Sequence, residues 1–220
     1  MNASQPTVTV VDYGAGNILS VTRALAHVGA LATVSDDPAA VAAADRILLP
    51  GVGAFGKAMD ELTKRRLIEP LRAYAKSGRP FLGICLGMQL MLEESAEFGS
   101  QEGLGLIAGK VLPIPAVTAA GERHKIPHIG WNGLVPPSPG RWSGTVLEGQ
   151  ESGVSMYFVH SFAAQPDRPE DRLADADYNG QKISAAIGRD NLTGIQCHPE
   201  KSGVAGLLVL QNFIKSGAQA

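Results

Sequence analysis

The first half of the chain alternates short apolar runs of β type with segments of helical periodicity, and this alternation limits the fold more than any other feature. The expected strands are residues 7–11, 30–34, 46–49 and 81–84. The expected helical segments are residues 18–27 and 54–76. Strands that alternate with helices are typical of parallel sheets, so the pattern predicts an α/β fold with a mostly parallel central sheet flanked by helices.

Glycine, proline and asparagine mark where these elements end. Asn17 is expected to cap the first helix and Gly29 to end it, while Pro70 is expected to break or kink the segment 54–76. From Leu104 onward the chain changes to short β segments separated by glycines and prolines. The pair Asn179-Gly180 there predicts a tight hairpin. We therefore expect additional antiparallel β segments in the second half, before a closing helix at 204–215.

Composition indicates one soluble domain. The chain has 220 residues, 45% of them hydrophobic, and we expect a single domain over 1–220 with its core at about 7–216. A formal net charge of −2 gives no electrostatic reason to expect a nucleic-acid or membrane partner. No apolar run approaches the ~20 residues that span a bilayer, and the N-terminus does not resemble a signal peptide. A cytoplasmic location is therefore expected.

A cysteine stands between two glycines in the segment Gly83-Ile84-Cys85-Leu86-Gly87, where an expected strand meets a helix. This is the G-x-nucleophile-x-G form of a nucleophile elbow, whose glycines relieve crowding around a residue in strained backbone geometry. The N–H groups at a helix N-terminus would also favour a negative charge on the thiol. Alternatively, Cys85 is a buried packing residue that merely lies between two glycines.

A second segment, "GIQCHPE" at 194–200, places His198 and Glu200 two residues apart. On an extended segment such side chains project to the same side, and the proline between them disfavours a helix. Glu200 would hold one ring nitrogen of His198 while the other nitrogen exchanges a proton with Cys85. The simpler alternative is a strand end with a solvated histidine and glutamate. Cys197 adjoins His198, but alternation directs its side chain toward the core.

The remaining histidines do not indicate a metal site. His124 and His128 are four residues apart, but Pro127 disfavours a shared helical face, and no cysteine or carboxylate cluster completes a ligand set. The glycine-containing segment "DYGAGNILS" lacks the spacing and the lysine of a Walker-type phosphate loop. We therefore expect neither a metal nor a cofactor.

The elbow "GICLGMQL", followed later by "HPE", resembles the pattern of triad-type (class I) glutamine amidotransferases. The likeness extends across the chain through the segments "VVDYGAGNILS", "LPGVGAFGKAM", "KIPHIGWN" and "YFVHSF". Together they closely resemble the family of glutaminase subunits of imidazole glycerol phosphate synthase, in histidine biosynthesis. The resemblance implies a single-domain class I amidotransferase fold that hydrolyses L-glutamine through a cysteinyl thioester. One position departs from that family, because the residue before the histidine is usually aromatic and is Cys197 here.

The resemblance implies roles for individual residues. Cys85 would be the nucleophile, His198 the general base and acid, and Glu200 the residue that orients the imidazole. Glutamine would be bound by Gln89, Glu97, Ser161 and Phe162. The backbone N–H groups of the oxyanion hole would come from Val52, Gly53 and Leu86. Without the family, Gln89 and Glu97 would be taken as surface polar residues, and the segment 50–53 as an ordinary tight turn.

The reaction also implies a partner. Ammonia released into water is mostly protonated and no longer nucleophilic, so a second chain must accept it nearby. The resemblance implies a (β/α)8-barrel cyclase subunit in a heterodimer, with interface residues Tyr13, Asn17, Trp131, Asn132 and Lys201. Trp131 could instead be a core aromatic residue. Two alternatives stay open: a glutaminase subunit for another synthase, such as pyridoxal phosphate synthase, and a non-catalytic binding module.

The glycines of the segment 50–53 suggest a means of control. Glycine allows a peptide plane to reorient at small cost, and the resemblance suggests that a backbone N–H of this segment must face the oxyanion before hydrolysis is fast. We therefore expect the isolated chain to be a poor glutaminase.

Overall fold

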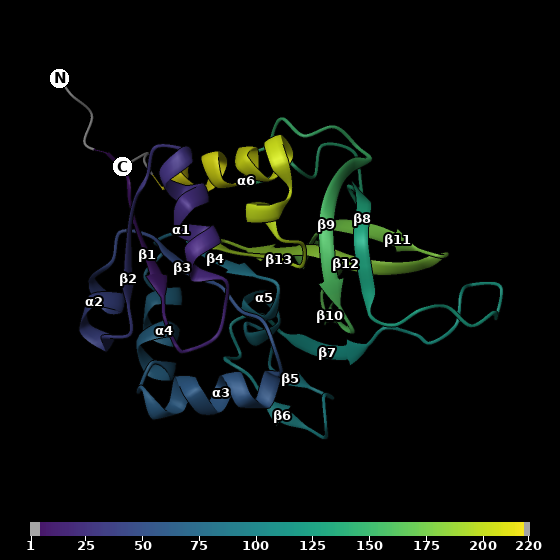
Figure 1. The fold of residues 1–220 in the computed structure, drawn as a ribbon, viewed down its shortest axis with the longest axis horizontal. Helices are drawn as coiled ribbons and strands as arrows, with labels where there is room; N and C mark the ends of the chain where they lie inside the picture. The colour runs from purple at the N-terminus through teal and green to yellow at the C-terminus, as the bar shows by residue number, and fades with distance from the viewer. Residues whose placement is uncertain (1–4, 218–220) are drawn as a thin grey trace.

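The alternating segments of the first half form the parallel part of one large sheet. The computed structural model describes residues 5–217, and its main sheet has nine strands in the order β2-β1-β3-β4-β13-β12-β11-β8-β9 (Figure 1). The first five of these pair in parallel: β2 (Leu31–Ser35), β1 (Thr7–Val11), β3 (Ile47–Leu49), β4 (Phe81–Ile84) and β13 (Leu192–Ile195). The predicted α/β fold with a parallel sheet between helices is confirmed.

The second half of the chain supplies the antiparallel strands. Four of them continue the main sheet: β12 (Gln181–Arg189), β11 (Arg172–Tyr178), β8 (His128–Val135) and β9 (Val154–His160). Asn179 and Gly180 form the tight turn between β11 and β12, at φ 54° and 79°, as the sequence predicted. The antiparallel strands therefore make up a larger share of the central sheet than expected.

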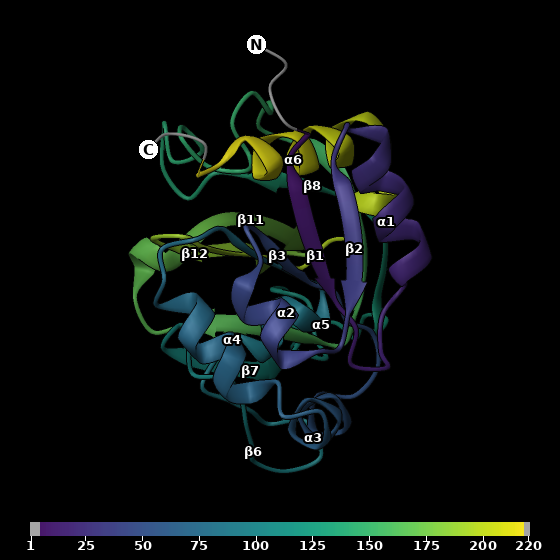
Figure 2. The same ribbon diagram turned by 90° about the vertical axis from the view of Figure 1, so that its left-hand side faces the viewer.

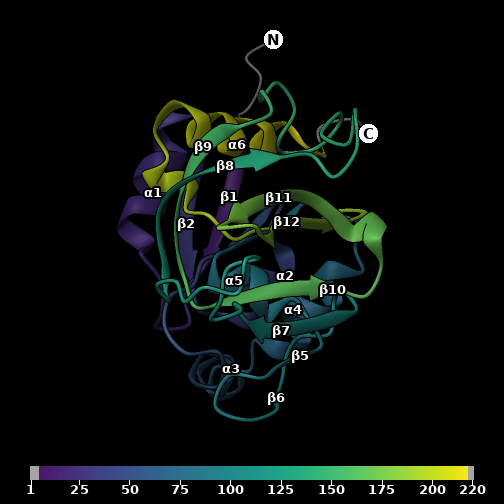
Figure 3. The ribbon, with the colours of Figure 1, turned by 90° about the vertical axis from the view of Figure 1, so that its right-hand side faces the viewer.

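A second, smaller sheet lies below the antiparallel strands and beside α5 (Figure 3). Its strands, in order, are β10 (Phe162–Pro166), β7 (Gly109–Pro113), β5 (Glu94–Ser95) and β6 (Gln101–Glu102). β9 and β10 are separated by Ser161 alone, so the chain passes from the main sheet to the second sheet at this residue.

Helices cover both faces of the main sheet (Figure 2). On one face lie α1 (Ile18–His27) and α6 (Gly203–Lys215). On the other lie α2 (Pro38–Ala43), α3 (Phe55–Lys64), α4 (Ile68–Ala75) and the short α5 (Leu86–Leu90). Two 3-10 turns, η1 (Pro169–Asp171) and η2 (Pro199–Lys201), complete the elements, and each face buries its own apolar core. Within residues 5–217 no helix is long and apolar enough to cross a membrane.

Some predicted boundaries differ from the observed ones. The segment 54–76 does divide into two helices, but the break lies at 65–67, with Arg66 at φ 58°, and not at Pro70. Pro70 lies in the first turn of α4, where a missing N–H breaks no helical hydrogen bond. Asn17 caps α1 as predicted, since its Oδ1 accepts a hydrogen bond from the Ser20 N–H at 3.3 Å. Gly29 follows that helix at φ 88°.

Candidate active site

β4 carries Cys85 to the carboxyl end of the parallel strands, and α5 begins directly after it. The backbone of Cys85 has φ 54° and ψ −110°, the strained geometry of a nucleophile elbow. Close backbone approach explains both flanking glycines. A Cβ atom on Gly87 would lie 1.9 Å from the Leu49 carbonyl oxygen, and one on Gly83 would lie 2.7 Å from the Gly87 carbonyl oxygen.

His198 and Glu200 follow β13, the parallel neighbour of β4. The carboxyl ends of these two strands lie side by side, which brings His198 and Glu200 close to Cys85. His198 Nδ1 lies 2.8 Å from Glu200 Oε1, and both side chains are buried. Nε2 of His198 is buried with no partner at hydrogen-bonding distance within the described chain. Burial alone would lower the pKa of His198, but the nearby Cys85 thiol and Glu200 carboxylate outweigh it and raise this pKa to about 9. His198 is therefore mainly imidazolium at neutral pH.

Cys197 points into the apolar core, as strand alternation predicted. Its side chain is 1% exposed and packs in the same cluster as Leu210 and Phe213 of α6. Burial raises the pKa of the Cys197 thiol. A protonated, inaccessible thiol is a poor nucleophile, so Cys85 is the cysteine that the site presents to a substrate.

A cavity of about 280 Å³ opens beside Cys85. Its walls contain every residue that the sequence indicated for glutamine binding or for the oxyanion hole: Val52, Gly53, Leu86, Gln89, Glu97, Ser161 and Phe162. The structure adds Pro127, Val159 and His160, which the sequence did not indicate. A cavity of this size with a few converging polar groups fits a small amino acid.

Two amide side chains form a buried chain of hydrogen bonds on one side of the cavity. Gln89 Nε2 donates to the Phe162 carbonyl oxygen at 2.9 Å and to Gln196 Oε1 at 3.0 Å. Gln196 Nε2 in turn lies 3.6 Å from Cys85 Sγ. Both donors of Gln89 are used in this way, so only its Oε1 is free to accept a hydrogen bond from a ligand.

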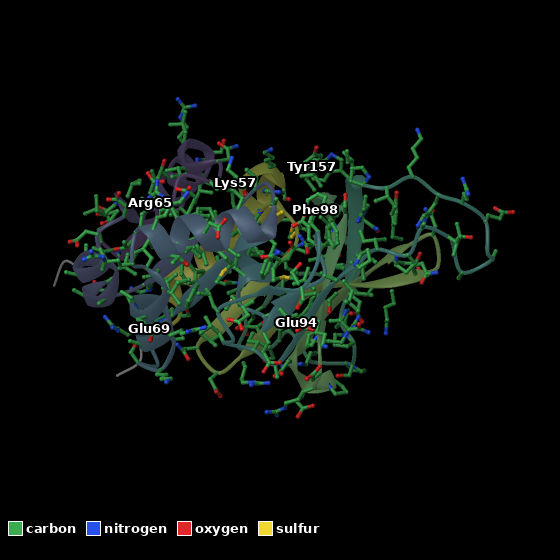
Figure 4. All side chains as sticks on the ribbon, turned by 90° about the horizontal axis from the view of Figure 1, so that it is seen from below. Lys57, Arg65, Glu69, Glu94, Phe98 and Tyr157 are labelled. Atoms are coloured by element: carbon green, nitrogen blue, oxygen red, sulfur yellow. The ribbon has the colours of Figure 1, made fainter. Side chains whose placement is uncertain are left out.

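Glu97 connects the cavity to the start of α3. Its Oε2 accepts a hydrogen bond from the Phe55 N–H at 2.6 Å. The helix has no capping side chain of its own at Ala54, so Glu97 supplies this contact from a distant part of the sequence. Its second oxygen remains for a cationic group in the cavity. Neighbouring Phe98 is 88% exposed and lies, like Lys57 of α3, on the side of the molecule seen in Figure 4.

The expected oxyanion hole is closed by the backbone of the chain itself. The Leu86 N–H donates to the Gly51 carbonyl oxygen at 3.3 Å, so this carbonyl takes the place where the N–H of Val52 would be useful. Gly51 and Val52 share one peptide plane, and its rotation would exchange the carbonyl for the N–H. Gly51 has no room for a side chain, because a Cβ atom would lie 2.4 Å from Tyr13 Oη and 2.8 Å from Leu86 Cβ.

Two neutral histidines support the segment that lines the cavity. His160 Nδ1 lies 2.8 Å from the Phe162 carbonyl oxygen, which can only accept, so this nitrogen carries the proton. His128 Nδ1 lies 3.0 Å from His160 Nε2 and must donate to it. Burial lowers the pKa of both histidines to about 4. The uncharged pair therefore holds the Phe162 carbonyl, to which Gln89 also donates, in place.

Four of the five expected partner residues lie at or near the surface. Trp131 is 59% exposed, packs edge-on against Tyr157, and Lys201 Nζ lies 5.7 Å from the centre of the Tyr157 ring. Asn132 is half-buried on β8, and its Nδ2 donates to the Asp177 carbonyl oxygen at 2.7 Å. The half-buried Asn17 precedes α1, which contacts the turn that carries Lys201.

Tyr13 differs from these four residues. Its side chain is fully buried, and its hydroxyl donates to the Pro50 carbonyl oxygen at 2.8 Å. Burial raises the pKa of this phenol, so it stays a neutral donor. Its side chain therefore supports the segment 50–53 and cannot touch a partner in this conformation.

Among residues 5–217, no group of three or more His, Cys, Asp or Glu residues could hold a metal ion.

Comparison with known families and curated proteins gives consistent matches over nearly the whole chain. The family model described as glutamine amidotransferase class-I matches residues 9–216. The chain is 52% identical over 210 residues to "Imidazole glycerol phosphate synthase subunit HisH 1" of Legionella pneumophila (strain Lens), covering 95% of this chain and 99% of that protein. It is 46% identical over 209 residues to the subunit HisH of Syntrophotalea carbinolica, covering 94% and 98%.

Solved structures share the fold at lower sequence identity. The structure of PurLQS from Thermotoga maritima has a TM-score of 0.71 at 20% identity, covering 96% of this chain and 98% of that one. A glutamine amidotransferase from Thermotoga maritima has a TM-score of 0.58 at 15% identity, covering 90% and 77%. At such identities the likeness concerns the fold alone.

Proposed function

Because this chain belongs to the class I glutamine amidotransferases, we propose that Cys85, His198 and Glu200 are its catalytic triad. The chain is the glutaminase subunit of an imidazole glycerol phosphate synthase and acts in histidine biosynthesis. One observation carries the residue assignment: the thiol on a strained turn faces a buried imidazole that a carboxylate holds by its other nitrogen. The cavity beside the thiol supports glutamine as the substrate that these residues attack.

The triad geometry supports a two-step hydrolysis. The Cys85 sulfur attacks the side-chain carbonyl carbon of glutamine, and the carbon–nitrogen bond breaks as His198 gives its proton to the leaving nitrogen. Ammonia departs and a thioester remains. His198, now neutral, accepts a proton from water as the water attacks the thioester. The carbon–sulfur bond breaks, glutamate leaves, and the thiolate and imidazolium are restored while Glu200 holds the ring.

Glutamine is held, in this proposal, by groups at both ends of the cavity. Glu97 pairs with the substrate ammonium through its free oxygen, and Gln89 accepts a hydrogen bond through Oε1. Ser161 and Phe162 position the substrate from the link between β9 and β10. Leu86 and either Val52 or Gly53 donate to the oxyanion once the Gly51–Val52 peptide has rotated.

The same rotation makes hydrolysis depend on the partner. With the Gly51 carbonyl on the Leu86 N–H, one oxyanion donor is occupied and another faces away. Since one such donor is worth about 100-fold in rate or more, the isolated chain is expected to be a poor glutaminase. We expect a cyclase subunit of (β/α)8-barrel form, carrying its nucleotide ligand, to raise the rate at least ~100-fold within a cytoplasmic heterodimer.

An active-site electrophile tests the central assignment. A chloroketone analogue of glutamine should label Cys85 and leave Cys197 unmodified, and peptide mapping by mass spectrometry locates the adduct. Excess L-glutamine should protect Cys85 if the cavity is the glutamine site. An adduct on Cys197, or labelling that glutamine does not slow, would remove Cys85 from the role of nucleophile. If the analogue labels neither cysteine, the result would favour a non-catalytic binding module instead.

A further inference from the structure

Gln196 lies directly beside the nucleophile, although it belongs to neither the triad nor the glutamine subsite described above. It follows β13, whose last residue Ile195 pairs with Ile84, and the Cys85 N–H donates to the Ile195 carbonyl oxygen at 2.7 Å. The side chain of Gln196 is 0% exposed. A fully buried amide is costly unless its polar atoms are paired, so its contacts define what it does.

The orientation of the Gln196 amide, that is, which end carries the oxygen, follows from the Phe162 carbonyl, to which it is connected through Gln89. The Phe162 carbonyl oxygen can only accept, so the Gln89 atom that faces it is the donor Nε2. The same Nε2 faces Gln196, so the Gln196 atom opposite must be the acceptor Oε1. The other end of the Gln196 amide is then Nε2, and it points an N–H at Cys85 Sγ over 3.6 Å. No rotation of either amide by 180° satisfies all three contacts.

We propose that Gln196 is a further catalytic residue, which donates a hydrogen bond to the Cys85 sulfur and stabilises its thiolate. The inference rests on the proposed role of Cys85 as the nucleophile. A thiolate sulfur accepts a stronger hydrogen bond than a thiol, so a fixed donor favours the ionised form. The Cys85 thiol also donates to the Val159 carbonyl oxygen at 3.9 Å, and His198 Nε2 has no partner at hydrogen-bonding distance, so within residues 5–217 Gln196 Nε2 is the side-chain donor in contact with the sulfur.

Other ionisable groups surround the sulfur and must be counted in any test. His198, with Glu200 behind it, follows β13; His160 ends β9; Tyr13 lies beneath the segment 50–53; Glu97 faces the cavity; and Cys197 lies in the core. None of these groups changes when Gln196 is replaced by methionine, which has a similar length and shape but no N–H. The replacement also removes the oxygen that accepts a hydrogen bond from Gln89 Nε2, so a shift of the Cys85 alkylation profile reports the donor, whereas a change in KM for glutamine reports the contact with Gln89.

The test is the pH dependence of Cys85 alkylation by iodoacetamide in the full chain, with the modified residue located by peptide mapping. In Gln196→Met, the midpoint of the rate profile is expected to rise by about one pH unit, a tenfold smaller thiolate fraction below the midpoint. Gln196→Asn keeps the amide but is one methylene shorter, so it should raise the midpoint in the same direction. Gln150→Met is the matched control, because Gln150 Nε2 donates to the Ala205 carbonyl oxygen and Gln150 does not line the cavity beside the thiol.

The outcomes separate this inference from its premise. If glutamine-analogue labelling maps to Cys85 but both Gln196 variants keep the wild-type midpoint while KM for glutamine rises, then Gln196 only holds Gln89 and the proposal is wrong. If the analogue labels another residue, the nucleophile assignment itself fails. A thermal unfolding curve of each variant shows whether the variant is folded at the assay temperature, and only folded variants are compared. A midpoint that rises in both Gln196 variants and not in Gln150→Met supports the proposal.

Discussion

Cys85 has a positive φ angle, and Gly83 and Gly87 on either side of it leave no room for a Cβ atom. The thiol is therefore held in one position beside the cavity. Cys85→Ser should lower the rate of glutamine hydrolysis by several orders of magnitude, because serine is a far weaker nucleophile beside this histidine. The complex with its cyclase should still form product from added ammonium at alkaline pH. Steady-state assays with glutamine and with ammonium check both parts. Glutamine-dependent turnover near the wild-type rate would contradict the assignment.

Cys197, three residues before Glu200, is expected to contribute to stability and not to catalysis. Cys197→Ala removes a small buried group, so the free energy of unfolding should fall by about 1 kcal/mol while kcat stays near the wild-type value. Urea unfolding and steady-state kinetics measure the two quantities. A large loss of kcat with unchanged stability would show that Cys197 takes part in the chemistry.

At this scale the motifs indicated the proposed triad, and the family resemblance indicated most of the residues that line the cavity, but neither indicated Gln196. Cys85, His198 and Glu200 could be predicted because the elbow and the "HPE" triplet are local patterns. Gln196 stands two residues before His198, yet its contact with the sulfur depends on the β13–β4 register, which no single segment specifies. Tyr13 was expected at the interface because it lies in a partner-facing segment. The sequence could not show that its ring turns inward beneath Pro50.

Between β3 and α3, the segment 50–53 acts as one small element. Gly53 has φ 104° and open space where a Cβ atom would lie, so alanine there strains the backbone without a clash. Gly53→Ala should therefore change the activation by partner and ligand by a larger factor than it changes KM for glutamine. Glutaminase assays of the chain with and without partner and ligand give both numbers.

Gly78→Ala is the control for this prediction. Gly78 also has a positive φ, 76°, and open space around a Cβ atom, but it follows α4 and lies outside the site. It should lower stability by a similar amount and leave the activation ratio unchanged. If Gly78→Ala alters the ratio as much as Gly53→Ala does, general destabilisation explains the effect and the segment is not the gate.

Elements were easier to predict where a local pattern decides them. The turn at Asn179-Gly180 and the cap at Asn17 follow from side chains that favour those conformations wherever they occur. The break in 54–76 was expected at Pro70, but it lies at 65–67, where Arg66 has φ 58°. Pro70 fits the first turn of α4, where no helical hydrogen bond needs its N–H. The second sheet also escaped prediction, since β5 and β6 have only two residues each and depend on partners distant in sequence.

For the molecule as a whole, the His128–His160 pair makes stability depend on pH. Both have a pKa of about 4 when folded, against about 6.5 in the unfolded chain, so the unfolded state binds more protons between these values. The stability they contribute is present above pH 6.5 and is lost as pH falls toward 4, by up to about 1.4 kcal/mol per pH unit for each histidine. Urea unfolding at pH 7, 6 and 5 measures the slope.

His160→Gln should reduce that slope, because glutamine removes one of the two titrating groups. His198 acts in a different range, because its raised pKa of about 9 gives stability that is complete below 6.5 and is lost as pH rises through 9. Equal slopes in the wild type and in His160→Gln would mean that the buried pair does not titrate on unfolding as expected.

The proposed partner surface gives a further test at this scale. Trp131→Ala should weaken association with the cyclase or uncouple ammonia transfer, because an aromatic anchor is often worth about 2 kcal/mol or more at an interface. Leu31→Ala, on the opposite edge of the main sheet, should change neither. Sedimentation and the ratio of glutamine consumed to product formed decide the matter. Unchanged association and an unchanged ratio would make Trp131 a structural residue.

In the proposed mechanism, the hydrogen bond from the Leu86 N–H to the Gly51 carbonyl means that the resting protein blocks one of its own oxyanion donors. A neutral amide oxygen of the chain then occupies the N–H group that would otherwise donate to the anionic oxygen of the substrate. A hundredfold suppression of idle hydrolysis corresponds to only about 2.7 kcal/mol, the scale of one or two hydrogen bonds. Waste of glutamine in the cell would then be set by the equilibrium of a single amide plane, which any contact that favours its rotation can shift.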